Sequence, residues 1–140
     1  MIRLLDSSVL IAALLPKEHY HHECVSELLR PHVHICTHAL NEVFSTLTGG
    51  RLGYQIAANE VTKMIRRHIL PRVSVVTLSG DEIMDAQEDA ERCGVRGGAI
   101  YDFMHFTAAK KIRADAIVTL NRTDFESISR HGGPEALLPR

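Results

Sequence analysis

The sequence predicts a three-layer α/β/α sandwich with a central parallel sheet. Short apolar runs alternate along the chain with longer segments whose apolar residues keep helical spacing. A strand followed by a helix and another strand requires a crossover, so we expect parallel strands with helices on both faces of the sheet. The length of 140 residues suits one domain with a sizeable core, and we treat residues 1–140 as a single unit.

The first predicted strand is the apolar run at residues 1–5. The polar residues 6–8 follow it and cap a short apolar helix that Pro16 ends. Residues 18–29 carry an apolar stripe at helical spacing, which predicts a second helix that Pro31 terminates. The chain therefore starts with one strand and two helices.

The second predicted strand is the short run at residues 33–36. We expect Thr37 to cap the helix that follows, whose apolar residues between 40 and 47 share one face. The glycine-rich stretch 49–53 closes this helix.

The rest of the chain continues the same alternation. Pro71 separates a helical pattern from a β-branched run, and the glycine-rich stretch 94–98 separates two further helices. The remaining predicted elements are a helix at 55–69, a strand at 73–77, a helix that begins after Ser79 and runs to Cys93, a helix at 100–112, a strand at 116–120 and a short helix at 122–127.

Composition excludes several classes of protein. A net charge of −1 argues against a protein that coats nucleic acid through a bulk positive field, although it does not exclude a nuclease. The longest apolar run, residues 9–15, is far too short to cross a membrane, and no signal sequence is recognisable, so we expect a cytoplasmic protein with no membrane partner. Three widely spaced cysteines without a Cys-x-x-Cys pair are expected to be buried and unpaired.

Four carboxylates follow predicted strands or open the helices beyond them. They are Asp6, Glu42, Asp102 and Asp124, separated by 36, 60 and 22 residues. In open parallel sheets ligands bind beyond the carboxyl ends of the strands, so the fold should bring these acids together. Gathered carboxylates repel one another unless a cation neutralises them, and oxygen ligands of this kind suit Mg²⁺ or Mn²⁺. Each acid alone could be only a helix cap or a turn residue, so the prediction depends on the set.

The sequence resembles the PIN-domain ribonucleases, most closely the small VapC-type toxins of toxin–antitoxin systems. The matching blocks are LLDSSVLIAAL at 4–14, the helix around 41–43, GGAIYDFMHFTAAKK at 97–111 and ADAIVTLNRTDFE at 114–126. The resemblance implies a PIN-like fold and an acidic metal site formed by Asp6, Glu42, Asp102 and Asp124, which would also be the catalytic residues.

The resemblance further implies polar support for that site from Ser8 and Thr119. Many members carry Asn in place of Ser8, and many place an acid near Asn121, which here adds a neutral polar group. Family members of this type are Mg²⁺- or Mn²⁺-dependent endoribonucleases that form homodimers and are silenced by a cognate antitoxin. The resemblance therefore implies RNA as the substrate, with a second copy and an antitoxin as partners.

Histidines and cations outside the acid set carry weaker signals. The cluster His19, His21 and His22 lacks the spacing of a metal site, and a surface helix explains it more simply. His38 and His105 lie near Glu42 and Asp102 in sequence, and we expect them to be partly buried with satisfied hydrogen bonds. The dispersed lysines and arginines include residues that an RNA backbone would need.

Three other functions stay open from the sequence. A stand-alone RNA-processing PIN nuclease would use the same acids without an antitoxin. A phosphotransferase or phosphatase with Asp6 as nucleophile would need a second acid two residues later, where this chain has Ser8. A PIN-fold binding module without activity would not require all four acids.

Overall fold

The computed structural model describes residues 1–140 and contains one parallel sheet with the strand order β3-β2-β1-β4-β5. The strands are β1 (Arg3–Leu5), β2 (Val33–Cys36), β3 (Ser74–Val76), β4 (Ala116–Val118) and β5 (Glu135–Leu137). The three-layer α/β/α prediction is confirmed. The four predicted strands are all present; β2 has the predicted bounds, and the other three are shorter than expected.

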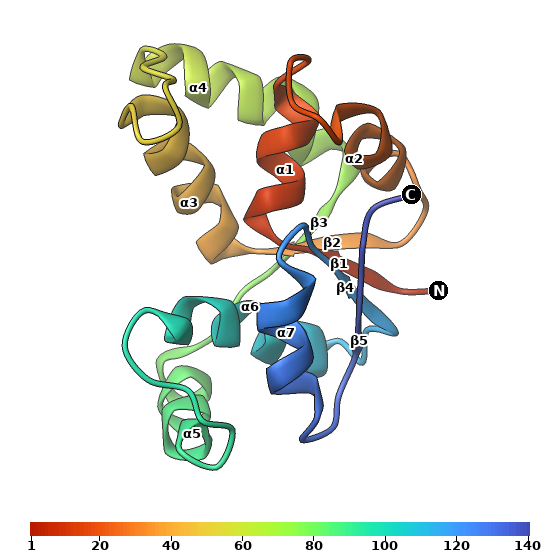
Figure 1. Cartoon of the computed structure of the whole chain (residues 1–140), viewed down its shortest axis with the longest axis vertical. Helices are drawn as coiled ribbons and strands as arrows, with labels where there is room; N and C mark the ends of the chain where they lie inside the picture. Colours follow the sequence, from red (N-terminus) through yellow and green to blue (C-terminus); the bar gives the residue numbers. More distant parts are fainter.

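Helices cover both faces of the sheet (Figure 1). They are α1 (Ser7–Leu14), α2 (His21–Leu28), α3 (Thr37–Thr48), α4 (Ala58–Met64), α5 (Gly80–Ala90), α6 (Ala99–Lys111) and α7 (Arg122–Ser129). A π-helical segment at Ile65–Ile69 and a 3-10 turn at Leu70–Arg72 extend α4. Helices α1 to α4 lie on one side of the sheet and α5 to α7 on the other. None of the helices is long and apolar enough to span a membrane.

Two apolar cores hold these layers together, one on each face. Alternate residues of a strand point to opposite faces, so Leu4 and Ile117 pack with α5 to α7 while Leu5 and Val118 pack with α1 to α4. Phe125, fully buried, is among the largest side chains of the first core. The three cysteines are buried and unpaired, as predicted.

Three details differ from the sequence prediction. The fifth strand, β5, was not expected, because it has only three residues and follows the turn formed by Gly132 and Gly133. Thr37 was expected to cap α3, but the cap position is Cys36 and no side chain caps this helix. Helix α2 begins at His21, later than expected.

The register of the sheet aligns the carboxyl ends of β1 and β4. Leu5 pairs with Val118, and the amide of Asp6 donates to the carbonyl of Val118 at 3.2 Å. Asp6 and Thr119 are therefore the first residues beyond two adjacent strands. This edge is where the sequence predicted a site.

Candidate active site

Asp6 follows β1 directly and is 2% exposed. It is the N-cap of α1, and its Oδ1 accepts a hydrogen bond from the Val9 amide at 3.3 Å. The Ser8 hydroxyl donates to Oδ1 at 2.5 Å, and the Thr119 hydroxyl donates to Oδ2 at 2.6 Å. Burial raises the pKa of Asp6, although His105 and these hydrogen bonds oppose the rise. Both carboxylate oxygens are thus held in a defined orientation.

The hydroxyls of Ser8 and Thr119 connect Asp6 to the backbone that follows β4. Ser8 Oγ accepts from the Leu120 amide at 3.0 Å, and Thr119 Oγ1 accepts from the Asn121 amide at 2.9 Å. Because each hydroxyl accepts from the backbone, its own proton is directed to the carboxylate. The structure therefore places Ser8 and Thr119 as polar support for Asp6.

Glu42 reaches the same edge from the second turn of α3. Its Oε1 lies 2.5 Å from Nε2 of His105, a residue of α6 that is only 1% exposed. His38, one turn before Glu42, places its Nε2 3.6 Å from the same oxygen and stacks its ring on Tyr101. Burial would raise the pKa of Glu42, but the contact with His105 lowers it below its ordinary value. Glu42 is therefore ionised, with one oxygen held by an imidazole from another helix.

Asp102 lies in the first turn of α6 and is partly buried. Burial and the negative charge of Asp6 raise its pKa to about 6, with smaller contributions in the same direction from Asp124 and Glu42, while His105 opposes them. The other three predicted acids thus act electrostatically on Asp102. A cation among them would relieve the repulsion.

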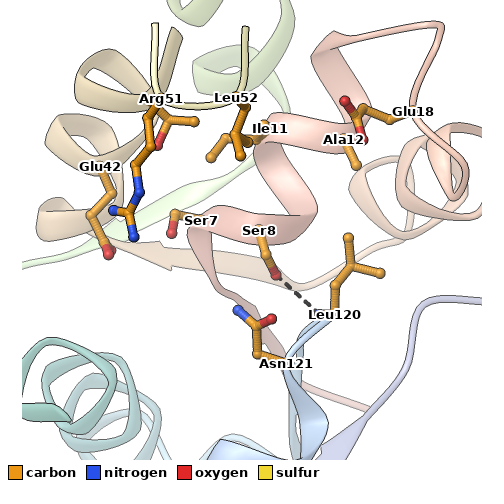
Figure 2. A pocket seen from close by; sticks show the side chains of 11 residues that line it. Ser7, Ser8, Ile11, Ala12, Glu18, Glu42, Arg51, Leu52, Leu120 and Asn121 are labelled. Atoms are coloured by element: carbon orange, nitrogen blue, oxygen red, sulfur yellow. Dashed lines mark hydrogen bonds between the residues drawn. The ribbon is translucent and has the colours of Figure 1, made fainter. Parts of the chain in front are cut away.

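Two hollows border the acids. The α1–α3 hollow, of about 460 Å³, lies between α1, α3 and the loop after α3, and is lined in part by Ser8, Glu42 and Asn121 (Figure 2). The α6–α7 hollow, of about 340 Å³, is lined in part by Asp102 and Asp124. Glu42 thus belongs to one hollow and Asp102 and Asp124 to the other, with Asp6 buried at the strand ends.

The chemistry of the acid set fits a hard divalent cation. Its donors are all oxygen atoms, and carboxylates with room for water are the ligands that Mg²⁺ and Mn²⁺ prefer. As the side chains stand, no three His, Cys, Asp or Glu residues are positioned to hold one ion. The negative charge of the site nevertheless favours a cation. To bind one, the carboxylate side chains would have to rotate toward it. The cluster of His19, His21 and His22 does not form a metal-binding group either.

Sequence reasoning missed two features of this edge. His105 was expected to be a satisfied, partly buried residue, but it is almost fully buried, contacts Glu42, and its Nδ1 has no hydrogen-bond partner. Its position three residues after Asp102 was a signal, although its partner is 63 residues away. Arg51, which lines the α1–α3 hollow, was expected only as one of several dispersed cations that an RNA backbone would need, and its position beside Glu42 was not expected.

The fold and the acidic edge together define a structural class of protein. Its members are parallel α/β sandwiches with carboxylates gathered beyond the ends of the strands. The sequence model of the PIN domain matches residues 3–130. The chain therefore belongs to the PIN-domain family. No curated protein sequence matches it significantly.

Solved structures of low sequence identity share the fold over nearly the whole chain. A DNA-bound VapBC from Salmonella typhimurium gives a TM-score of 0.71 at 19% identity, covering 99% of this chain and 98% of the other. Mycobacterium tuberculosis VapC20, a Sarcin-Ricin loop cleaving toxin, gives 0.70 at 20% identity, covering 95% and 97%. Rickettsia felis VapBC2, bound to a DNA fragment from its promoter, gives 0.70 at 15% identity, covering 100% of both chains.

Proposed function

We propose that this PIN-domain protein is a metal-dependent endoribonuclease that hydrolyses RNA phosphodiester bonds with Mg²⁺ or Mn²⁺. Its site would be formed by Asp6, Glu42, Asp102 and Asp124. The observation that carries the proposal is the gathering of these acids beyond the ends of β1 and β4, where burial and the negative charges of Asp6, Asp124 and Glu42 raise the pKa of Asp102 to about 6. Four acids kept within reach of one another at a strand edge destabilise the fold unless they serve a cation.

The protein residues have separate tasks in this proposal. Ser8 and Thr119 fix the orientation of Asp6, and His105 fixes Glu42. Asp102 and Asp124 face the α6–α7 hollow from two helices. A bound divalent cation would supply charge neutralisation and Lewis acidity toward a phosphodiester. The four carboxylates would hold it, and the two hollows leave room for the RNA chain on either side.

We also infer that the protein is the toxin of a toxin–antitoxin pair, with a cognate antitoxin protein as partner. The support comes from similar structures: VapC20 is a toxin that cleaves the sarcin–ricin loop, and the VapBC structures are bound to DNA. Induced expression in a bacterial host should arrest growth, whereas Asp102→Asn should not. Normal growth with the wild-type protein at high expression would contradict the toxin assignment.

The enzymatic proposal is tested by incubating total RNA with the purified protein and Mn²⁺ and mapping the cut ends. We expect discrete cleavage that EDTA abolishes and that Asp6→Asn or Asp102→Asn reduces by at least about 100-fold, as expected when an essential group for charge stabilisation is lost. The matched control is Asp85→Asn, an exposed acid on α5, which should cleave like the wild type. Undiminished cleavage in EDTA would contradict the proposal.

A further inference from the structure

The α1–α3 hollow contains one cation beside the proposed acid site. Among the residues that line the α1–α3 and α6–α7 hollows, Arg51 is the only lysine or arginine. Figure 2 shows its side chain reaching down from the loop after α3, with the guanidinium beside Glu42 and Ser7 and the amide of Asn121 across the opening. A positive group therefore lies in the same hollow as Glu42, one of the four acids.

The Arg51 guanidinium is not committed to an ion pair. No carboxylate oxygen lies within 4.0 Å of it, and the ion pairs of Glu42 are with His38 and His105 instead. Five N–H donors on an exposed side chain are thus available to a ligand. Phosphate and carboxylate are the groups that a guanidinium binds with two parallel hydrogen bonds.

The loop that carries Arg51 has a defined conformation. Gly50 and Gly53 have φ angles of 77° and 83°, in the left-handed region that favours glycine. The Gly50 amide donates to the Tyr54 carbonyl at 2.8 Å, and the Gly53 amide donates to the Gly50 carbonyl at 3.0 Å. The Tyr54 hydroxyl in turn donates to Glu18, in the loop between α1 and α2, at 3.0 Å. The turn therefore presents Arg51 over the hollow.

Neutral polar groups complete the lining around the guanidinium. Ser7 and Asn121 bring a hydroxyl and an amide to the same hollow, and both can donate to an anionic oxygen. The hollow already carries two carboxylates, Glu18 and Glu42, against the one cation Arg51, and an acid at residue 121 would have added a third. The amide keeps this side of the site less negative than the α6–α7 hollow, which Asp102 and Asp124 line without a lysine or arginine.

From these observations we propose that the α1–α3 hollow binds a phosphate of the RNA chain adjacent to the scissile one, with Arg51 as its cation. Ser7 and Asn121 would supply neutral donors. This inference rests on the proposed ribonuclease function and assigns it a substrate subsite. Because the contact is made to the RNA backbone, it contributes affinity without reading base sequence.

The test measures RNA binding separately from cleavage. A labelled single-stranded RNA oligonucleotide is titrated by fluorescence anisotropy with Asp102→Asn protein, alone and combined with Arg51→Gln, Arg51→Lys or Arg67→Gln. Arg67 is exposed, lines neither hollow and is the charge-matched control. We expect Arg51→Gln to weaken binding at least about tenfold, Arg51→Lys less, and Arg67→Gln less than about twofold.

Salt dependence gives a second readout. Loss of one phosphate contact should reduce the slope of log affinity against log salt by about 0.7 for a single strand in Arg51→Gln only. Mn²⁺ affinity of Arg51→Gln, measured by calorimetry, should equal or exceed that of the wild type, which excludes collapse of the acid site.

The outcomes separate the two proposals. Equal RNA binding by the Arg51→Gln and Arg67→Gln proteins, or no binding by the Asp102→Asn parent, overturns the phosphate subsite. If the wild type cleaves RNA in that case, the ribonuclease proposal stands alone. If the wild type cleaves nothing but binding depends on Arg51, the ribonuclease proposal fails and the phosphate contact stands.

Discussion

Burial and the negative charges of neighbouring acids raise the pKa of Asp102. Its pKa rises from 3.8 to about 6, so between these values the folded protein holds a proton that the unfolded chain has released. The free energy of unfolding therefore falls as the pH rises from about 4 to about 6. At higher pH the carboxylate is charged in both states, and the full cost of its environment is present.

Replacing the charged Asp102 side chain with a neutral one should stabilise the metal-free protein. A pKa change of this size corresponds to about 3 kcal/mol, and solvent screening of a partly exposed side chain reduces it, so Asp102→Asn should raise the free energy of unfolding at pH 7 by about 1–2 kcal/mol. Urea denaturation in EDTA at pH 4 and pH 7 measures this. The gain should nearly vanish at pH 4, and equal stability of the two proteins at pH 7 would contradict the coupling.

His105 tests whether Glu42 needs a fixed orientation. His105→Leu keeps a buried side chain of similar size but removes the contact to Glu42, and we expect Mn²⁺ affinity to fall about 10- to 100-fold. His105→Gln retains an N–H donor and should lose less. Calorimetry of both variants, with the exposed His68→Leu as control, makes the measurement. Wild-type affinity in His105→Leu would show that the contact has no role in orienting Glu42.

At the scale of elements, β5 depends on a close approach between the turn before it and α6. A Cβ atom at Gly133 would lie 2.6 Å from Cζ of Phe106, whereas one at Gly132 would meet nothing within 4 Å. Both glycines have left-handed φ angles, 103° and 100°, so both alanine variants carry similar backbone strain.

A comparison of Gly133→Ala with Gly132→Ala therefore isolates the steric contact with Phe106. Gly133→Ala should be less stable than Gly132→Ala by about 1–3 kcal/mol, the usual cost of overpacking a core. Urea denaturation of the two variants gives the difference directly. Equal stabilities would mean that the turn moves away from Phe106 without cost.

The sequence was sufficient for elements with strong local signals. Strands β1 and β4 are buried on both faces, so each is a continuous apolar run, such as Leu4–Leu5 or Ile117–Val118, and this made both strands predictable. The strand β5 was not predictable, because its three residues are held mainly by pairing with β4. Local propensity contains little information on a pairing of this kind.

At the scale of the whole molecule, a second charged cluster lies at the end of β1 opposite to the four acids. Glu27 of α2 is fully buried and pairs with Arg3 of β1 at 2.8 Å and with Arg30 at 3.1 Å. It also accepts from the backbone amide of Arg140 at 3.1 Å. This one carboxylate joins α2, the first strand and the end of the chain.

Removing the negative charge of Glu27 should lower the free energy of unfolding without affecting the acid site. Glu27→Gln leaves buried Arg3 without its partner, and we expect the free energy of unfolding to fall by about 3–5 kcal/mol. Glu88→Gln, an exposed acid on α5, is the control and should change stability by less than about 0.5 kcal/mol. Urea unfolding measures the change in stability, and Mn²⁺ binding at low temperature, where the variant is folded, measures whether the acid site is intact. A loss of Mn²⁺ affinity in folded Glu27→Gln would contradict this separation.

The candidate site could be predicted only in part from the arrangement of the whole molecule. A parallel sheet places the residues after β1 and β4 together, so Asp6 and Thr119 could be placed from strand order alone. The contact of His105 with Glu42 and the position of Arg51 over the α1–α3 hollow depend on how α6 and the loop after α3 pack. Neither follows from spacing along the chain.

Calorimetric titration of Mn²⁺ into the purified protein tests the central claim, that the four acids form a divalent-cation site, most directly. We expect saturable binding by the wild type that Asp102→Asn weakens by at least about tenfold, since a charged ligand is lost. Asp85→Asn should bind like the wild type. Absence of Mn²⁺ binding by the wild type, or equal affinity in Asp102→Asn, would contradict it.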